Sequence, residues 1–343
     1  MNSFDPNAAA APESGAFGLD TPADEARVHL FGVPVEATTS YRRGTRHAPA
    51  AIHAASKQVD LEDLLTGRPW EAGIHWHDVD ERLLAIETKA SALALPVIAA
   101  GGAAAGPQFA RAAAQVDELL DEMNAIVYAR ASASIRAGHL VGLVGGDHST
   151  PFGSIRAHAE AYPGLGLLQF DAHLDLRAGY EGFRNSHASI VHNVAEATDA
   201  RVVALGIRDV GGDELDALER SNGRFQAVFA SDWARARSNG RLAARIAETV
   251  ELLPEQVYIT FDIDGLDPSL CPNTGTPVPG GLLWDETMDV LEALVASGRR
   301  IVGFDLVEVS PEPGRLAGTG WDEIVGARLL YRLLGFALQA NAA

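Results

Sequence analysis

The sequence predicts one α/β domain in which a mostly parallel sheet is covered by helices on both faces. The chain has 343 residues, of which 47% are hydrophobic and 21% are charged, which is enough for one large domain. Short β-prone runs alternate with helical stretches through the second half of the chain. These runs are apolar throughout rather than at every second residue, which is typical of strands buried on both faces of a parallel sheet.

Each predicted strand is a short apolar run bounded by turn-forming or polar residues. The predicted strands are 28–33, 139–144, 166–170, 202–206, 226–229, 256–261 and 300–304. The predicted helices are 50–64, 107–137, 152–162, 213–222, 239–253, 285–298 and 321–338. The glycine-rich stretch 98–106 predicts a loop or hinge. The apolar stretch 91–106 contains Pro96 and is too short for a membrane span.

The domain organisation follows from composition. Residues 1–26 are polar and acidic and are expected to form a flexible N-terminal arm. Residues 27–343 are expected to form a single catalytic domain with an extended N-terminal part at about 80–137. There is no internal repeat and no linker long enough to separate two domains.

The charge balance excludes several classes of partner. Lys and Arg total 27 against 46 Asp and Glu, for a formal net charge of -19. This excess disfavours binding to nucleic acid or to anionic membranes. The one cysteine, Cys271, cannot form an internal disulfide, and the first 25 residues lack the pattern of a signal peptide. We therefore expect a soluble cytoplasmic protein.

Clusters of polar residues directly follow several of the predicted strands. The clusters are Gly145–Thr150 (GGDHST), Asp171–Arg177 (DAHLDLR), Asp262–Ser269 (DIDGLDPS) and Asp305–Pro311 (DLVEVSP). Ligands of open parallel sheets bind beyond the carboxyl ends of the strands. The four clusters are therefore expected to meet at one edge of the sheet.

The residue types in these clusters are those of a metal site. Alternate residues of an extended segment point to the same side, so three side chains of the DAHLD segment would face one point. The candidate ligands are His148, Asp171, His173, Asp175, Asp262 and Asp264. Oxygen and imidazole donors without a thiolate suit Mn, Fe, Co or Ni. Two ions that share aspartates would balance the negative charge of these carboxylates better than one ion would. A single DxD segment is often only a turn or a helix cap, but so many carboxylates without a cation would repel one another.

The motifs together resemble the ureohydrolase family, which includes arginases and agmatinases. The resemblance rests on GGDHS, DAHxD, SHxS, DIDGLDPS with TGTPVPGG, and DLVEVSP, and on the early segment SYRRGTRHAPAAI. It covers about residues 28–338. It implies a three-layer α/β/α fold with a mostly parallel sheet, and assembly into homo-oligomers, usually trimers or hexamers.

The resemblance also implies two divalent metal ions per chain, Mn or Ni. One ion would be held by His148, Asp171, Asp175 and Asp262. The other would be held by His173, Asp171, Asp262 and Asp264, so that Asp171 and Asp262 bridge the pair.

The implied reaction is hydrolysis of a guanidino group to urea and an amine, or to urea and ammonia. Asp175 would accept and pass on a proton, and His187 of the SHAS segment would shuttle protons or orient the substrate. Glu308 would pair with the guanidinium nitrogens, and Thr276 would line the same pocket.

Departures from the arginase-type pattern bear on the substrate. Arg177 stands where that pattern has an asparagine, and Gly211 replaces an acid expected to hold an α-amino group. Phe183 and Ala188 are expected to make the pocket smaller. We therefore predict guanidine, or a small substituted guanidine or biguanide, as the substrate.

Three alternatives are kept. The first is an agmatinase, or a hydrolase of a guanidino acid whose carboxylate Arg177 would bind. The second is a subunit of a mixed oligomer that needs a paralogous partner for activity. The third, a one-zinc amide deacetylase of related fold, is disfavoured by the six candidate ligands. Residues 1–26 and 80–106 are expected either to contact other subunits or to shape the pocket mouth.

Overall fold

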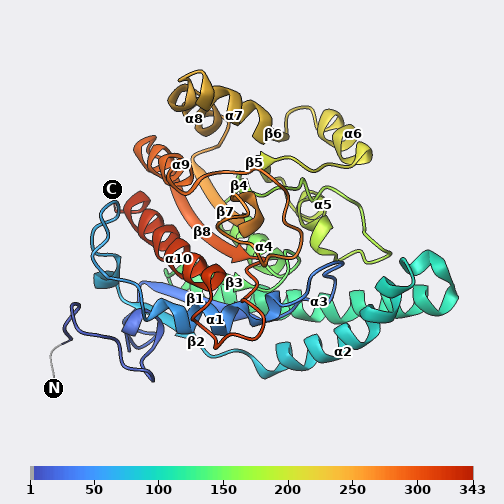
Figure 1. The fold of residues 1–343 in the computed structure, drawn as a ribbon, viewed down its shortest axis with the longest axis horizontal. Helices are drawn as coiled ribbons and strands as arrows, with labels where there is room; N and C mark the ends of the chain where they lie inside the picture. The colour runs from blue at the N-terminus through green and yellow to red at the C-terminus, as the bar shows by residue number, and fades with distance from the viewer. Residues whose placement is uncertain (1–3, 343) are drawn as a thin grey trace.

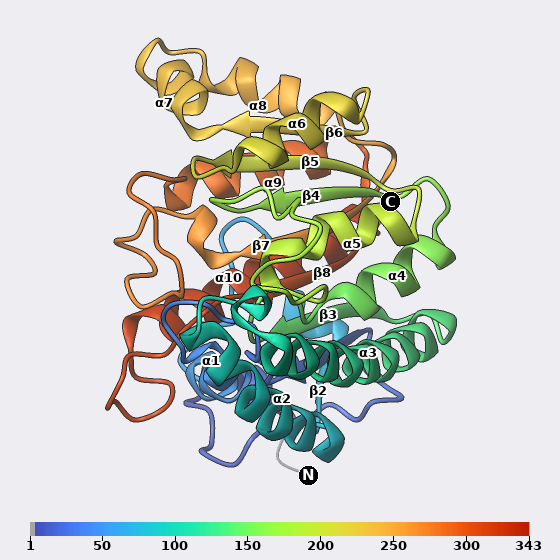
Figure 2. The same cartoon turned by 90° about the vertical axis from the view of Figure 1, so that its right-hand side faces the viewer.

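The computed structural model describes residues 4–342, and over this range the strands form one parallel sheet. The sheet has eight strands in the order β2-β1-β3-β8-β7-β4-β5-β6, and every neighbouring pair is parallel. Figure 2 shows the strands stacked in this order, with helices on both faces. The predicted three-layer α/β class is therefore confirmed.

The apolar runs form the strands. The strands are β1 (Val28–Val33), β2 (Ile74–His77), β3 (Leu140–Gly145), β4 (Gly166–Phe170), β5 (Arg201–Ile207), β6 (Phe225–Phe229), β7 (Gln256–Asp262) and β8 (Arg300–Val307). The central strands β3, β4 and β7 are buried almost along their whole length, because helices cover both of their faces. The edge strand β2 was not predicted, since its four residues, IHWH, alternate only weakly and pair with β1 alone.

One face of the sheet carries the helices of the largest hydrophobic core. These helices are α1 (Ala48–Ser56), α7 (Ala230–Ser238), α8 (Leu242–Glu251), α9 (Trp284–Ala296) and α10 (Trp321–Ala340). Helix α10 lies along β8 and also packs on α1 and α9 (Figure 1). In this core the rings of Phe170 and Phe261, from neighbouring strands, stack with their centroids 4.5 Å apart.

The opposite face carries the remaining helices. They are α2 (Glu81–Ala99), α3 (Pro107–Arg136), α4 (Phe152–Ala161), α5 (Ile190–Ala197) and α6 (Gly212–Arg220). Helix α3 packs on α4 and on α2. Helices α2 and α3 form an antiparallel hairpin that extends past the end of the sheet in Figure 1. Short 3-10 turns occur at Ala16–Gly18, Thr45–His47, Pro69–Ala72, Ala103–Ala105, His187–Ser189 and Ile263–Gly265.

Helices α2, α5 and α7 were not predicted. The sequence of α2 contains Pro96, which suggested a break, but this proline lies in the last turn of the helix. A proline there removes only one backbone hydrogen bond, so the helix continues to Ala99 and the predicted loop is the short connection to α3. Asp80 starts α2 by accepting a hydrogen bond from the backbone N–H of Arg82.

Part of the N-terminal segment packs against the domain. Phe17 is buried, its ring lies 4.9 Å from that of Tyr331 in α10, and its backbone N–H donates to the hydroxyl of Ser56. The flexible arm at residues 1–26 stays a prediction, but residues around Phe17 are held by these contacts. Along residues 4–342, every helix is too short or too polar to cross a lipid bilayer.

Candidate active site

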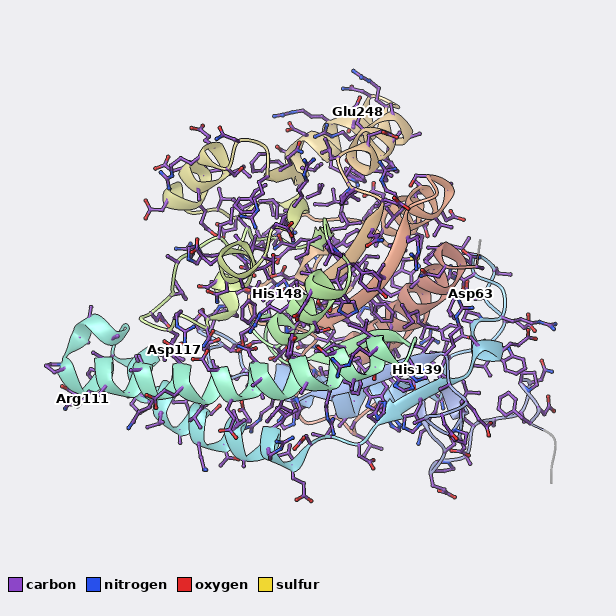
Figure 3. The ribbon with its side chains drawn as sticks, turned by 180° about the vertical axis from the view of Figure 1, so that it is seen from behind. Asp63, Arg111, Asp117, His139, His148 and Glu248 are labelled. Atoms are coloured by element: carbon purple, nitrogen blue, oxygen red, sulfur yellow. The ribbon has the colours of Figure 1, made fainter. Side chains whose placement is uncertain are left out.

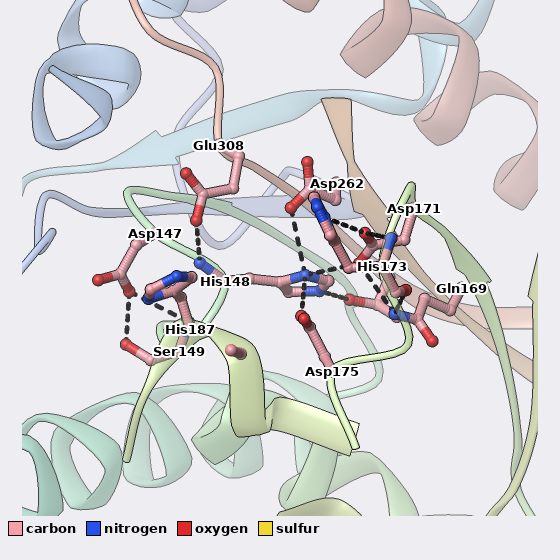
Figure 4. Close-up of polar contacts among 12 residues, drawn as sticks. Asp147, His148, Ser149, Gln169, Asp171, His173, Asp175, His187, Asp262 and Glu308 are labelled. Carbon is pink, nitrogen blue, oxygen red and sulfur yellow. Dashed lines mark hydrogen bonds and ion pairs between the residues drawn. The ribbon is translucent and has the colours of Figure 1, made fainter. Parts of the chain in front are cut away.

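The four polar clusters meet at one edge of the sheet, as the sequence predicts. They follow β3, β8, β7 and β4, which are consecutive neighbours in the sheet. Figure 4 shows the imidazole of His148 between the carboxylates of Asp262 and Asp175, with Asp171 and His173 beside it. Most of these side chains are buried, so the cluster lies at the floor of a depression rather than on the surface.

The first group of candidate ligands surrounds His148. Its Nδ1 atom lies 3.1 Å from Oδ2 of Asp175 and 3.2 Å from Oδ2 of Asp171. Oδ2 of Asp262 is 3.4 Å from the same nitrogen. The ligand atoms of His148, Asp171 and Asp175 all lie within 4.8 Å of one another, a spacing that suits a metal ion.

The second group surrounds His173. Its Nδ1 atom lies 3.2 Å from Oδ2 of Asp264 and 3.4 Å from Oδ1 of Asp171. The ligand atoms of these three residues also lie within 4.8 Å of one another. Asp171 belongs to both groups, with Oδ1 near His173 and Oδ2 near His148. The six residues named from the sequence are therefore brought together, and Asp171 is common to both groups.

The hydrogen bonds of His148 show that this cluster suits a cation. Nε2 of His148 lies 2.9 Å from the hydroxyl of Thr260, which itself donates to Oδ1 of Asp305 at 3.0 Å. The hydroxyl must therefore accept from Nε2–H, so Nδ1 is the ring nitrogen that faces the carboxylates and that could bind a metal ion in place of a proton. This Nδ1 atom is buried and makes no hydrogen bond of good geometry. An imidazole nitrogen grouped with buried carboxylates is the donor set of a divalent metal ion.

The pKa values show the same need for positive charge. Burial lowers the pKa of His173, but the charge of Asp264 and contacts with Asp171 outweigh it and raise that pKa to about 12. Burial likewise opposes protonation of His148, yet its carboxylate neighbours raise its pKa well above 6.5. Burial and then the charge of Asp171 raise the pKa of Asp175 to about 7. The cluster thus holds protons, on its two histidines and on Asp175, where a metal ion would otherwise balance the carboxylate charge.

Glu308 faces the cluster from the end of β8. Its Oε1 accepts a hydrogen bond from the backbone N–H of His148 at 2.9 Å. Burial, and then the charge of Asp262, raise the pKa of Glu308 well above its usual range. Glu308 and Asp175 are both non-glycine residues with positive φ, 61° and 51°. Such backbone conformations are uncommon and cluster at functional sites, where the surrounding structure holds a side chain in a required direction.

His187 lies at the start of the 3-10 turn before α5. Its backbone N–H donates to the hydroxyl of Thr38 at 3.0 Å, and this hydroxyl donates to Oδ2 of Asp147 at 2.9 Å. Burial, and then the charge of His173, lower the pKa of His187 to about 4. The imidazole is therefore neutral near pH 7 and faces the cavity beside the ligand groups.

A cavity of about 470 Å³ opens above the cluster. Its floor is formed by ligand residues with Glu308 and Thr276, and the hydroxyl of Thr276 donates to Oδ2 of Asp264 at 3.3 Å. Arg177 lies on its wall, as the sequence predicts for a substrate-binding residue. Nη2 of Arg177 is 3.5 Å from Oε2 of Glu214, and the guanidinium lies 5.2 Å from the centroid of the Tyr180 ring.

One expectation about the pocket is wrong. Phe183 does not narrow the cavity, because its side chain is fully buried in the cluster formed chiefly by α2 and α3. Ala188 does line the cavity. Tyr41, Arg42 and Tyr180 also line it and were not predicted. The segment that holds Tyr41 and Arg42 has a turn-rich composition and is part of the family-like segment SYRRGTRHAPAAI, and these were the signals that it could reach the site.

Comparison with known proteins agrees with this geometry. The arginase family model matches residues 26–335. N(1)-aminopropylagmatine ureohydrolase from Thermus thermophilus is 34% identical over 324 residues, which cover 94% of both chains. Agmatinase from Proteus mirabilis is 34% identical over 286 residues, or 82% of this chain and 79% of that protein.

Solved structures share the fold. Proclavaminate amidino hydrolase from Streptomyces clavuligerus has a TM-score of 0.70 at 26% identity and is covered over 100% of its length, against 97% of this chain. A hypothetical agmatinase from Burkholderia thailandensis has a TM-score of 0.71 at 23% identity, covering 96% of this chain and 92% of that one. The latter likeness supports the fold alone.

Proposed function

The chain belongs to the arginase family and is a ureohydrolase, and on that premise we propose that it hydrolyses a guanidino compound with an aminoalkyl tail, as agmatine has. The observation that carries the proposal is the cavity of about 470 Å³ above the ligand cluster. A bare guanidinium group would fill only a small part of it. The names of the relatives support a substrate with an aminoalkyl tail better than they support free guanidine or a small alkylguanidine.

The charges on the cavity wall support a cationic tail. Arg177 would repel an ammonium group, but the carboxylate of Glu214 offsets its charge and the ring of Tyr180 lies against its guanidinium. Asp209 adds a further carboxylate to the wall, and among residues 4–342 it forms no ion pair. We assign Asp209 to the tail ammonium of the substrate.

We propose that the chain's own residues divide the chemistry as follows. His148, Asp171, Asp175 and Asp262 would hold one divalent ion, and His173, Asp171, Asp262 and Asp264 the other, with Mn or Ni the metals that suit this donor set. When bound, the two ions would activate water for attack on the guanidinium carbon.

Four residues, of which Asp175 is also a ligand, would act on the substrate or beside it. Glu308 would accept hydrogen bonds from the guanidinium through its free carboxylate oxygen. Asp175 would take up the proton that the nucleophile loses. Asp175 would then pass this proton to the leaving amine, while His187, neutral near pH 7, would orient the substrate. Thr276 would keep Asp264 in place from the cavity wall.

A guanidino acid is the second candidate substrate. Arg42 lines the cavity mouth, and its Nη1 donates to the backbone carbonyl of Pro272 rather than to a carboxylate. Its positive charge would suit a substrate carboxylate.

Turnover of a substrate panel tests the proposal. The panel is agmatine, 4-guanidinobutyrate, methylguanidine and guanidine, assayed by urea release on protein of measured Mn or Ni content. We expect the highest kcat/KM for agmatine, and Asp209→Asn should raise its KM about tenfold because a charge-assisted contact is lost. A preference for guanidine or methylguanidine would contradict the proposal, and a preference for guanidinobutyrate would select the second candidate.

We also propose that the chain assembles into a homo-oligomer. Light scattering on the purified chain tests this directly, and the same sample tests the mixed-oligomer alternative. Turnover by the chain alone would exclude a required paralogous partner. No turnover despite full metal occupancy would favour one.

A further inference from the structure

The α2–α3 hairpin reaches the loop that lines the cavity. This loop, residues 176–189, runs from the ligand cluster to His187 and carries Tyr180 on the cavity wall. In Figure 3, Asp117 on α3 lies below the loop, on the part of the hairpin that extends away from the sheet toward Arg111. The hairpin therefore lies against the loop and can support it.

Asp117 binds the loop backbone with both of its carboxylate oxygens. Oδ2 accepts from the backbone N–H of Arg184 at 3.1 Å, and Oδ1 accepts from the backbone N–H of Asn185 at 2.8 Å. The side-chain amide of Asn185, which is 3% exposed, donates to the carbonyl of Asp117 and to Oδ1 of Asp121. Backbone amides bound to a carboxylate make strong, charge-assisted hydrogen bonds. Two consecutive residues of the loop are thus fixed to one turn of α3.

The tip of the hairpin adds a second anchor. The backbone N–H of Ala103 donates to the carbonyl of Glu181 at 2.8 Å. Gly182 has a φ of 93°, and a Cβ atom there would lie 2.2 Å from Cβ of Ala103, so only glycine allows this approach. The next residue, Phe183, buries its ring among the apolar side chains of α2 and α3. Backbone and side-chain contacts therefore hold residues 181–185 to the hairpin.

The anchored residues lie between the two parts of the loop that face the cavity. Tyr180 precedes them and stacks under Arg177, while His187 follows them. We propose that Asp117 is a positioning residue, which fixes the loop so that Tyr180 and His187 meet the substrate in one arrangement. The effect on turnover rests on the proposed function, whereas the effect on the loop itself does not.

Limited proteolysis of the metal-loaded full chain tests the anchor without any substrate. Trypsin cuts after Arg184 only when the bond to the buried Asn185 becomes accessible, so the cleavage rate follows local opening of the loop. We expect Asp117→Ala to speed this cut by about tenfold, since two charge-assisted hydrogen bonds are lost. Cleavage after Arg235, in α7 on the other face of the sheet, should be unchanged. Glu118→Gln, exposed on the same helix, is the matched control and should leave both rates unchanged.

The second readout separates positioning from general destabilisation. The ratio of kcat/KM for agmatine to that for methylguanidine should fall in Asp117→Ala, because Tyr180 lines the cavity and the longer substrate would contact more of its wall. A loss of folded protein would lower both values equally. Asp117→Asn keeps one acceptor oxygen and should restore part of the ratio.

Asn185→Ala provides the same test if Asp117→Ala does not fold. It removes the side-chain contacts to α3, and hydrogen exchange of the peptide spanning residues 178–189 should rise in it. Unchanged cleavage and exchange in the variants would overturn the proposal, as would faster cleavage with an unchanged substrate ratio. If the wild-type protein hydrolyses no guanidino compound, the proposed function fails, and the cleavage and exchange rates still decide whether the hairpin anchors the loop.

Discussion

Two groups of histidines lie in different parts of the sheet, and their surroundings shift the pKa values of His148 and His173 upward but those of His29 and His77 downward. His148 and His173 lie at the carboxyl ends, where aspartates raise their pKa. The edge histidines are His29 of β1, His75 and His77 of the edge strand β2, and His139, which lies just before β3 and is labelled in Figure 3. Within the edge group the rings of His29 and His139 stack with centroids 3.8 Å apart.

The edge histidines meet carbonyls and one another instead of carboxylates. Nε2 of His29, Nδ1 of His75 and Nδ1 of His139 each bond a backbone carbonyl of residues 21–26. Burial, and then the charge of His29, lower the pKa of His77 to about 4, and burial lowers that of His29. Among residues 4–342, both groups with metal-ligand spacing lie at the carboxyl ends of the strands, around His148 and His173. The comparison teaches that acidic neighbours, not a gathering of imidazoles, create the demand for a cation.

The largest effect is expected from removing the carboxylate that both ligand groups share. Asp171→Asn should lower metal content and reduce kcat/KM by about 10³-fold or more, because several kcal/mol of metal-assisted stabilisation are lost. Mass spectrometry of the metal content and urea release measure the two effects. Asp209→Asn, on the cavity wall, is the control and should retain both ions. Full metal content in Asp171→Asn would contradict the conclusion that acidic neighbours of the site histidines create the demand for a cation.

A smaller effect is expected from removing the hydrogen bond that the imidazole of His148 makes with Thr260. Thr260→Val removes the acceptor that keeps the proton on Nε2, so Nδ1 would no longer be held as the ligand atom. Metal affinity should fall about 10- to 100-fold, as for other hydrogen-bond partners of metal ligands. Calorimetric titration with Mn or Ni measures it. Thr287→Val, at a buried threonine whose hydroxyl bonds a helix carbonyl in α9, is the matched control. Equal affinities in the two variants would contradict the role of Thr260.

The smallest effect concerns the edge histidines and pH. A histidine whose pKa is lower in the folded state than in the unfolded state costs stability as pH falls below about 6.5, because only the unfolded chain takes up the proton. The loss grows down to about pH 4, the folded pKa of His77. Between pH 7.5 and 5, the free energy of unfolding should fall by about 1 kcal/mol more in the wild type than in His77→Gln, after allowing for partial exposure of His77.

Chemical denaturation of metal-loaded protein at the two pH values measures this difference. His47→Gln, at an exposed position just before α1, is the control and should follow the wild type. The same pH dependence in His77→Gln and wild type would show that the edge histidines do not differ from the site histidines in this way.

Much of the fold could be predicted from the sequence because its central strands are uniformly apolar. Seven strands and the long helix α3 follow directly from that pattern. The edge strand β2 could not be predicted, because four residues of mixed polarity owe their conformation to pairing with β1. Helix α2 was hidden by Pro96, whose cost depends on its place in the helix rather than on its presence.

The candidate ligands were predictable because each directly follows an apolar strand. The residues that support them were not. Thr260 meets His148 across 112 residues of sequence, and Asp117 meets Asn185 across 68. Nothing in the local sequence of a threonine inside a strand, or of an aspartate on a charged helix, marks such a partner. These roles arise only from tertiary packing.

The position of β8 has a consequence for the order in which the molecule is made. This strand, the last in sequence, lies between β3 and β7 and joins the sheet β2-β1-β3 to the sheet β7-β4-β5-β6. Until residues 300–307 have been synthesised, each half keeps an unpaired strand edge that can associate with other chains. His148 is on one half, and Asp171 and Asp262 are on the other. We therefore expect the nascent chain to need protection until β8 is inserted, and any chain truncated before β8 to be prone to aggregation and unable to bring the two sets of ligands together.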